Sequence, residues 1–299
     1  MKQWIRTTAA VLSAAVCCTG TAVCAAEETP AQFIGTSLSL TDDLGLNFYV
    51  GSADADNKDD FKVVFSGKCE ENGSEVRLRK KNGVFCATAN VSANNMGAEI
   101  TAELYRNIEG EWTKTDTAVY SVNAYLADTA PEAGWSADKT AAFGDLVETV
   151  KTYGQVAHAY FTTGDMTGID VPHHTAAELE ELGQKPDFDS DDATISLVLD
   201  SRMAVRLYIP GLEVGDQAAN GKKAIEGRNG SACFAFTGIS PTILDMHPAM
   251  KFNDVTYQFT PLSWCWRALN VDGGAPKNAA MANILVSYWQ DAKAFRSAV

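Results

Sequence analysis

The sequence predicts an α+β fold: two tandem, diverged copies of a small antiparallel β-sheet or β-sandwich unit, each closed by a C-terminal amphipathic helix. Three observations predict this fold. Four sequence blocks recur in the same order, segments of alternating apolar and polar residues fill each copy, and an apolar stripe with helical spacing ends each copy. The copies span 33–162 and 193–299, and an acidic linker, 163–192, separates them.

The recurring blocks carry the duplication. Residues 37–50 and 196–209 have apolar residues at matching positions, and Tyr49 corresponds to Tyr208. Three further pairs follow in the same order: 82–86 with 229–233, 120–122 with 257–259, and 153–160 with 288–295. One matching block could arise by chance, but four in sequence favour a diverged duplication.

Strands are predicted where apolar and polar residues alternate. In the first copy these segments are 38–50, 61–65, 76–78, 84–91, 100–105 and 117–122, and in the second they are 195–209, 232–236, 250–252 and 255–259. Asn82-Gly83 is a strong hairpin signal, and Asn253-Asp254 is a second turn.

The closing helices are predicted from apolar residues at three- and four-residue steps. The first stripe predicts a helix over about 138–161 and consists of Phe143, Leu146, Val147, Val150, Tyr153, Ala157 and Tyr160. The second consists of Met281, Ile284, Leu285, Tyr288, Ala292 and Phe295. Within the linker, 176–182 is a short helix candidate.

The N-terminus has the pattern of a secretory signal peptide over 1–25. Lys2 and Arg6 precede an uncharged run over 7–23, and small residues follow, which predicts cleavage near Ala25 or Ala26. An uncleaved anchor and lipidation of a cysteine in this segment are the weaker alternatives. We expect a secreted, extracellular protein that no longer contacts the membrane after cleavage.

The charge balance limits the partners. The chain has 24 basic and 38 acidic residues and a formal net charge of −14. A surface this acidic repels phosphate backbones and anionic lipids, so nucleic acid is not an expected partner.

Four cysteines follow the predicted cleavage site: Cys69, Cys86, Cys233 and Cys265. Export favours disulfides, and the simplest pairing joins the first two cysteines and the last two, each within one copy. Four buried thiols are the open alternative. No Cys-x-x-Cys pair suggests zinc.

The recurring blocks resemble an uncharacterised tandem repeat domain of exported surface or secreted proteins of gut Firmicutes, of the Clostridia and Ruminococcus type. The residues that carry the resemblance are 46–49, 91–96, 100–105, 120–125, Leu146-Val147 and Tyr153-Gly154. The second copy departs from the pattern at Pro241, Pro248 and 264–266. The resemblance implies an accessory or surface-associated module and provides no catalytic residues.

An acidic loop over 51–60 is the candidate metal site. Asp54, Asp56 and Asp59 supply oxygen ligands, which calcium prefers. Lys58 stands where an EF-hand would place a ligand, and no glycine follows it, so a solvated acidic loop is the favoured interpretation. No other cofactor is expected.

No catalytic residue is predicted. The sequence has no Gly-x-Ser-x-Gly elbow and no phosphate-binding glycine motif. His158 corresponds to Lys293 in the second copy, which indicates a solvent-exposed position. These features favour a non-catalytic protein, although a secreted hydrolase with a site between the two copies stays open.

Tryptophans are the candidate ligand-binding residues. Trp264, Trp266 and Trp289 occur in the second copy alone, and flat aromatic rings stack on sugars and mark binding surfaces. Core packing is the competing interpretation for each of them. The favoured function is a secreted binding module for a glycan, a cell-wall polymer or a host protein, with a structural spacer as the alternative.

Overall fold

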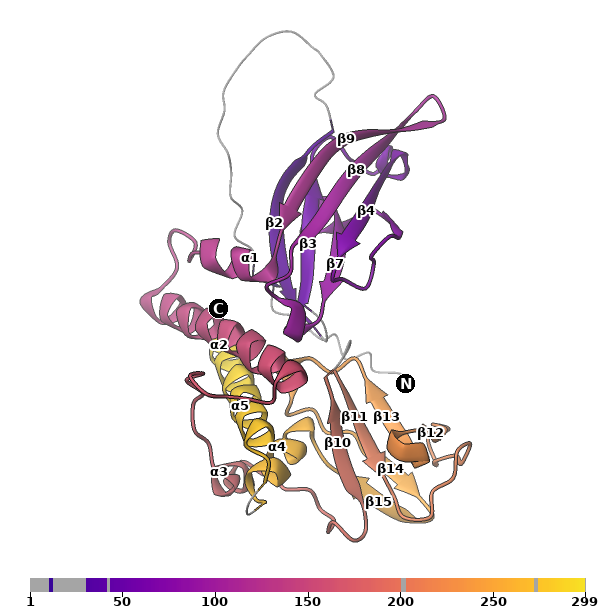
Figure 1. Ribbon diagram of the computed structural model, residues 1–299, viewed down its shortest axis with the longest axis vertical. Coiled ribbons are helices and arrows are strands. Elements are labelled where there is room, and N and C mark those ends of the chain that lie inside the picture. Colours follow the sequence, from indigo (N-terminus) through magenta and orange to yellow (C-terminus); the bar gives the residue numbers. More distant parts are fainter. Residues whose placement is uncertain (1–10, 13–30, 42–43, 200–202, 272–273, 299) are drawn as a thin grey trace. The chain divides into compact units, whose positions relative to one another are not determined.

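The protein is an α+β protein with several small antiparallel sheets and a long C-terminal helix (Figure 1). The computed structural model describes residues 11–12, 31–41, 44–199, 203–271 and 274–298. Apart from Val11–Leu12, the predicted signal peptide lies outside the described residues. The chain divides into two compact units, Met1–Trp135 (unit 1) and Ser136–Val299 (unit 2).

Unit 1 consists of two antiparallel sheets and a short helix. One sheet has the strand order β1-β2-β3-β7-β6 and the other β5-β4-β8-β9. The strands are β1 Val11–Leu12, β2 Phe33–Leu40, β3 Leu44–Val50, β4 Phe61–Gly67, β5 Glu75–Arg77, β6 Arg79–Lys81, β7 Val84–Val91, β8 Ile100–Ile108 and β9 Glu111–Tyr120. The helix α1, Val122–Asp128, follows β9, and 3₁₀ turns occur at Lys58–Asp60 and Ala93–Asn95.

The core of unit 1 lies between its two sheets. Phe48 of β3 contacts Phe65 of β4 with ring centroids 5.6 Å apart, so the inner faces of the sheets meet. Large side chains from both sheets are fully buried there, among them Leu38, Leu46, Phe61, Ile100 and Leu104. In β8 every second residue from Ile100 to Leu104 is buried, as the alternating pattern predicts, whereas β3 is buried at every position except Tyr49.

Unit 2 combines a sheet, a hairpin and four helices. The sheet has the order β10-β11-β13-β12, and β14 pairs with β15. The strands are β10 Thr194–Val198, β11 Ala204–Tyr208, β12 Ile225–Glu226, β13 Ala232–Thr237, β14 Ala249–Phe252 and β15 Val255–Gln258. The helices are α2 Ala137–Thr162, α3 Ala176–Glu181, α4 Pro261–Leu269 and α5 Pro276–Ser297, with 3₁₀ turns at Arg228–Gly230 and Pro241–Ile243.

Most predicted elements are present. The Asn82-Gly83 turn joins β6 to β7, and the Asn253-Asp254 turn joins β14 to β15. The first long helix forms within one residue of its predicted bounds, and the second contains the whole predicted stripe. The alternating segments 38–50 and 195–209 differ from the prediction, because each is a hairpin of two strands and not one strand. The connection at 41–43 is polar and short, so the alternation continues across it.

The helix pair α2 and α5 forms one layer of unit 2 (Figure 1). The helices are antiparallel: Phe143 contacts Phe295 with ring centroids 5.9 Å apart, and Tyr153 contacts Tyr288 at 5.4 Å. Near the other end, the Tyr160 hydroxyl donates to Oδ1 of Asn278 at 3.1 Å. The two apolar stripes that the sequence predicts are therefore buried against each other.

This packing assigns α2 to unit 2. The sequence grouped this helix with the strands of the first copy, ending that copy at residue 162, whereas the unit boundary follows Trp135. The physical reason is that the stripe of α2 finds a long apolar partner in α5. Periodicity identifies a buried face but not the element that covers it.

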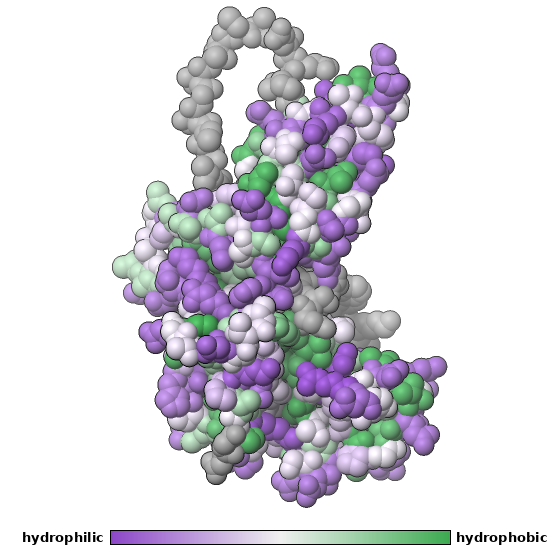
Figure 2. All heavy atoms as spheres, viewed as in Figure 1, coloured by the Kyte–Doolittle hydropathy of each residue, from purple (hydrophilic) through white to green (hydrophobic). Residues whose placement is uncertain are grey.

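The surfaces of the units give a mixed pattern. On the faces drawn in Figure 2, hydrophilic and hydrophobic residues are interspersed, and the large exposed hydrophobic residues come from many different elements. Scattered apolar residues of this kind are normal for a folded surface. Within the described residues, no helix combines the length and apolarity needed to cross a membrane.

Candidate functional site: an aromatic pocket beside α4

A pocket of about 460 Å³ lies beside α4, entirely within unit 2. This volume falls in the range that small-molecule sites occupy, roughly 300–1,000 Å³. Three aromatic residues line it: Phe188, Trp264 and Trp266. Two of these three are tryptophans that the sequence singled out as ligand-binding candidates.

The sequence defines the N-terminus of α4 through a capping box and a proline. The Thr260 side chain accepts from the Ser263 backbone N–H, Ser263 reciprocates at the Thr260 N–H, and Pro261 occupies the first turn. This capping box satisfies backbone donors that would otherwise lack partners. Leu262 and Cys265 are fully buried and hold the helix on its core side.

Trp264 and Trp266 flank the buried Cys265 and are both half-buried. Residues two apart on a helix point about 200° apart, so the two indoles do not form one flat platform. Both residues nevertheless line the same pocket. The buried indole N–H of Trp266 has no hydrogen-bond partner among the described residues.

Phe188 is the third aromatic lining residue and comes from the predicted linker. Its ring contacts Tyr257 at 5.5 Å and Phe259 at 6.3 Å between centroids. The neighbouring Asp187 accepts from the Gln258 N–H at 2.9 Å, so this part of the linker is tied to the end of β15. The segment is therefore an ordered pocket wall.

Polar groups complete the lining. Lys185, Asp189 and Arg267 carry charge, and Ser190, Thr194, Asn270 and Asn278 are neutral hydrogen-bonding side chains. Apolar ring faces combined with a few polar groups are typical of pockets that orient a ligand.

Arg267 acts mainly as a structural group. Its guanidinium donates to the carbonyl oxygens of Ala193 at 3.1 Å and Phe188 at 3.4 Å, and it packs over the Phe188 ring at 5.4 Å. Burial lowers the pKa of this guanidinium, and the negative charge of Asp189 opposes that shift. Arg267 thus joins the linker wall to α4.

The third tryptophan lies elsewhere. Trp289 of α5 is only 4% exposed and does not line the pocket. The Lys293 ammonium lies 5.0 Å from its ring centroid, one helical turn away. Its burial matches the core interpretation that competed with ligand binding in the sequence.

Trp112 on β9 provides a useful contrast in unit 1. The Lys62 ammonium lies 4.5 Å from its ring centroid and the Arg77 guanidinium 5.0 Å from it. Two cations therefore contact this ring, and Trp112 does not line the pocket, whereas Trp264 and Trp266 do.

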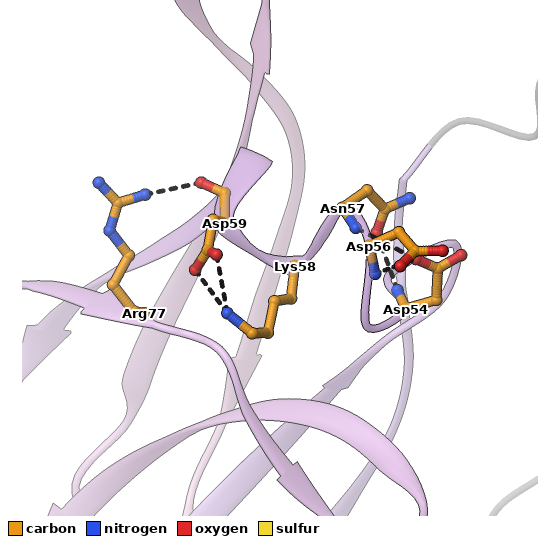
Figure 3. A network of polar contacts seen from close by, with 6 residues as sticks. All are labelled: Asp54, Asp56, Asn57, Lys58, Asp59 and Arg77. Atoms are coloured by element: carbon orange, nitrogen blue, oxygen red, sulfur yellow. Dashed lines mark hydrogen bonds and ion pairs between the residues drawn. The ribbon is translucent and has the colours of Figure 1, made fainter.

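The acidic loop is organised by its own hydrogen bonds (Figure 3). Oδ1 of Asp54 accepts from the N–H groups of Asp56 at 3.0 Å and Asn57 at 3.1 Å. Asp59 is paired with Lys58 at 2.8 Å, and its carbonyl oxygen accepts from Arg77. Among the described residues, no three His, Cys, Asp or Glu side chains gather as a metal-binding group, so Asp54, Asp56 and Asp59 are not brought together as one.

The four cysteines within the described residues are free thiols, and neither expected local pair is bonded. Cys86, Cys233 and Cys265 are buried, and Cys69 is partly buried. Burial raises the pKa of each thiol, which keeps it protonated and poorly nucleophilic near neutral pH.

Sequence reasoning identified Trp264 and Trp266 but missed the rest of the pocket lining, including Lys185, Phe188 and Asp189. The available signal was Phe188, a single aromatic residue inside the acidic run 187–192. A large apolar side chain in such a run is expected to pack against the folded domain, because leaving it in water costs about 1.5–3 kcal/mol.

No match to this chain is found among known protein families, curated proteins or solved structures.

Proposed function

We propose that the protein is a secreted, non-catalytic binding module that holds a saccharide, part of a glycan or cell-wall polymer, in the aromatic pocket beside α4. The observation that carries the proposal is that Trp264, Trp266 and Phe188 line one pocket together with neutral hydrogen-bonding side chains. Sugars present apolar C–H faces and a rim of hydroxyl groups, and such a lining complements both.

Binding is favoured over hydrolysis by the titratable groups of the pocket. Glycoside hydrolysis needs two positioned carboxylates, and in the described part of the chain Asp189 is the pocket's only carboxylate. A secreted hydrolase with a site between the copies is therefore the weaker alternative, and a structural spacer is the other one. A host protein is the alternative partner for the binding module.

We further propose that the chain contains two diverged tandem copies, related to the repeat domain of exported gut Firmicutes proteins that its blocks resemble. The sheet orders β2-β3-β7-β6 and β10-β11-β13-β12 support this. Each sheet is followed by a hairpin, β8-β9 or β14-β15, then by a short helix, α1 or α4, and finally by a long helix, α2 or α5.

The strand registers agree with the sequence blocks. Ser37 pairs with Asn47 in the first hairpin, and the corresponding Ser196 pairs with Arg206 in the second. Likewise Phe48 lies opposite Ala87, and the corresponding Leu207 lies opposite Phe234. A one-residue slip would turn every side chain to the other face, so matching registers support common descent of the two sheets.

The long helices add a third observation. Tyr153 and Tyr288, which correspond in the blocks, contact each other, while Phe143 contacts Phe295 and Tyr160 contacts Asn278. In the block numbering Asn278 corresponds to Phe143 and Phe295 to Tyr160, so the pair packs isologously, as two copies related by a twofold axis do.

The pocket belongs to the second copy alone under this correspondence. The helix caps Ser121 and Thr260 occupy equivalent places before α1 and α4. Counting from the caps, and not from the blocks 120–122 and 257–259, which differ from them by two residues, Ala127 and Asp128 stand where α4 has Trp266 and Arg267. We therefore expect one saccharide site per chain.

The test is binding of the labelled mature chain, 27–299, to an array of glycans, mucins and bacterial wall fractions. We expect binding to a saccharide that weakens at least about tenfold in Trp264→Ala and in Trp266→Ala. Trp112→Ala is the matched control and should bind like the wild type. Circular dichroism must show that each variant is folded.

The outcomes separate the candidates. A hit retained in folded Trp264→Ala and Trp266→Ala chains would exclude the pocket as the binding site. A blank across all saccharides would favour a host-protein partner or a spacer. Turnover of an array glycan would favour a hydrolase.

A further inference from the structure

Two cations border the aromatic pocket, and they are held differently. Arg267 already donates to two main-chain carbonyls, and Asp189 beside it opposes its charge. Lys185 reaches the pocket from the segment after α3, and its ammonium lies 5.4 Å from the centroid of the Trp266 ring. Lys185 is thus the cation that a ligand on Trp266 would meet.

The anchoring of Lys185 is weak. Within the described residues its Nζ forms an ion pair with Oε1 of Glu180 at 3.1 Å, and the two side chains are 50% and 52% exposed. Exposed pairs of this kind contribute little to stability and are screened by salt. The four-carbon stem of lysine is flexible, so the ammonium can follow a ligand that enters the pocket.

The remaining carboxylates around this ammonium have other partners or lie outside the lining. Asp187 accepts a main-chain N–H of β15, and the negative charge of Asp189 acts on Arg267. Asp191 and Asp192 do not line the pocket. The chain as a whole is acidic. A ligand bound next to Trp266, however, is close enough to Lys185 to interact directly with its positive charge.

We propose that the pocket selects saccharides that carry a carboxylate, of the uronic-acid type, and that Lys185 determines this specificity. The inference rests on the proposed saccharide binding. A sugar that stacks on Trp266 has to share the ring face with the ammonium. A neutral sugar displaces the ammonium from the ring and offers it no charged partner. An acidic sugar also displaces it, but its carboxylate accepts a charge-assisted hydrogen bond from the ammonium, which replaces the lost contact with the ring.

The experiment compares each uronic-acid oligosaccharide with its carboxyl-reduced form, which has the same linkage and length but no charge. Affinities for the mature chain are measured by calorimetry at low salt. We expect the acidic form to bind about fivefold more tightly. In Lys185→Gln this preference should disappear, and in the wild type it should narrow at 0.5 M salt, on the order of a 4 Å Debye length.

Lys151→Gln is the matched control, since Lys151 is a surface lysine of unit 2 paired with Glu148. It should keep the preference of the wild type. Equal affinity for both forms, tighter binding of the neutral form, or a preference that survives Lys185→Gln would each overturn the role of Lys185. If Trp264→Ala still abolishes binding in that case, the saccharide site stands and only the charge selection fails. Absence of binding to either form would count against both proposals for this ligand class.

Discussion

At the scale of single residues, the acidic loop shows how one carboxylate can shape a turn. Oδ1 of Asp54 closes the loop by accepting from two backbone N–H groups, whereas Asp56 contributes its backbone N–H to this turn. Aspartates in turns often bond backbone groups two or three residues ahead, and this use competes with metal binding. The sequence pattern alone does not distinguish the two uses.

We expect Asp54→Ala to lower the free energy of unfolding by roughly 0.5–1 kcal/mol, because two hydrogen bonds are lost from an exposed turn. Asp56→Ala is the control and should have little effect. Calcium at millimolar concentration should leave the midpoint of thermal unfolding unchanged, since the three aspartates form no cluster. A rise in that midpoint with calcium, reversed by a chelator, would restore the metal interpretation.

Tyr120 gives unit 1 a dependence on alkaline pH. Its hydroxyl donates to Oδ2 of Asp128 at 2.7 Å. Burial, followed by the hydrogen bond and charge of Asp128, raises the pKa of this phenol to about 12. Because the folded pKa lies above the unfolded value near 10, the stabilisation is complete below pH 10 and is lost as pH rises toward 12.

Tyr120→Phe should therefore unfold at a lower temperature than the wild type at pH 8, and the gap should close by about pH 11.5. The difference between the unfolding temperatures of the two proteins is measured at each pH in this range. The other tyrosines are present in both proteins, so their contribution cancels in this difference. A gap that stays constant with pH would contradict the assignment.

At the scale of elements, the sequence predicts well which segments form helices and strands, but it predicts poorly which of these elements pack against one another. The stripes from Phe143 to Tyr160 and from Met281 to Phe295 define α2 and α5, because burial of one helical face imposes a 3.6-residue period. That each stripe is covered by the other depends on tertiary packing. The same limit applies to the pocket, where Trp264 and Trp266 were predicted but Phe188 and Lys185 were not.

The α2–α5 interface contains a buried polar atom, the hydroxyl oxygen of Tyr288, whose burial is unfavourable. The Tyr288 side chain is fully buried, and its hydroxyl has no hydrogen-bond partner in the described part of the chain. Burying an unpaired hydroxyl costs about 1–3 kcal/mol. The ring itself contributes packing against Tyr153.

Tyr288→Phe should accordingly raise the free energy of unfolding by about 1 kcal/mol in chemical denaturation, because the ring remains and the unpaired hydroxyl is removed. Tyr160→Phe in the same helix pair removes a hydroxyl that is bonded to Asn278, so it should be neutral or destabilising. Destabilisation by Tyr288→Phe would show that the hydroxyl has a partner, such as a buried water.

At the scale of the whole molecule, the boundary between the two compact units differs from the boundary between the two proposed copies. Sequence blocks end the first copy after α2, whereas the compact unit 1 ends at Trp135. The proposed duplication would set which residues correspond, whereas the apolar surface of each helix sets what it packs against. A sequence comparison detects the first relation and has no access to the second.

Fragments test this division. The 31–135 fragment should fold alone and unfold cooperatively, and so should 136–299. The fragment 163–299 lacks α2 and exposes the apolar face of α5, so it should lose its cooperative transition or associate. Circular dichroism melts and sedimentation of the three fragments measure this. Cooperative, monomeric folding of 163–299 would contradict the assignment of α2 to unit 2.

The pairing of α2 with α5 has a consequence for how the protein is made. The segment 163–275 must be synthesised after α2 before α5 begins to appear. At ordinary rates of synthesis this takes on the order of ten seconds, far longer than a helix needs to form. During that interval the apolar stripe of α2 has no partner. The nascent chain therefore exposes an aggregation-prone apolar helix face during biogenesis. A chaperone that shields this face would improve the yield of folded unit 2 more than that of unit 1.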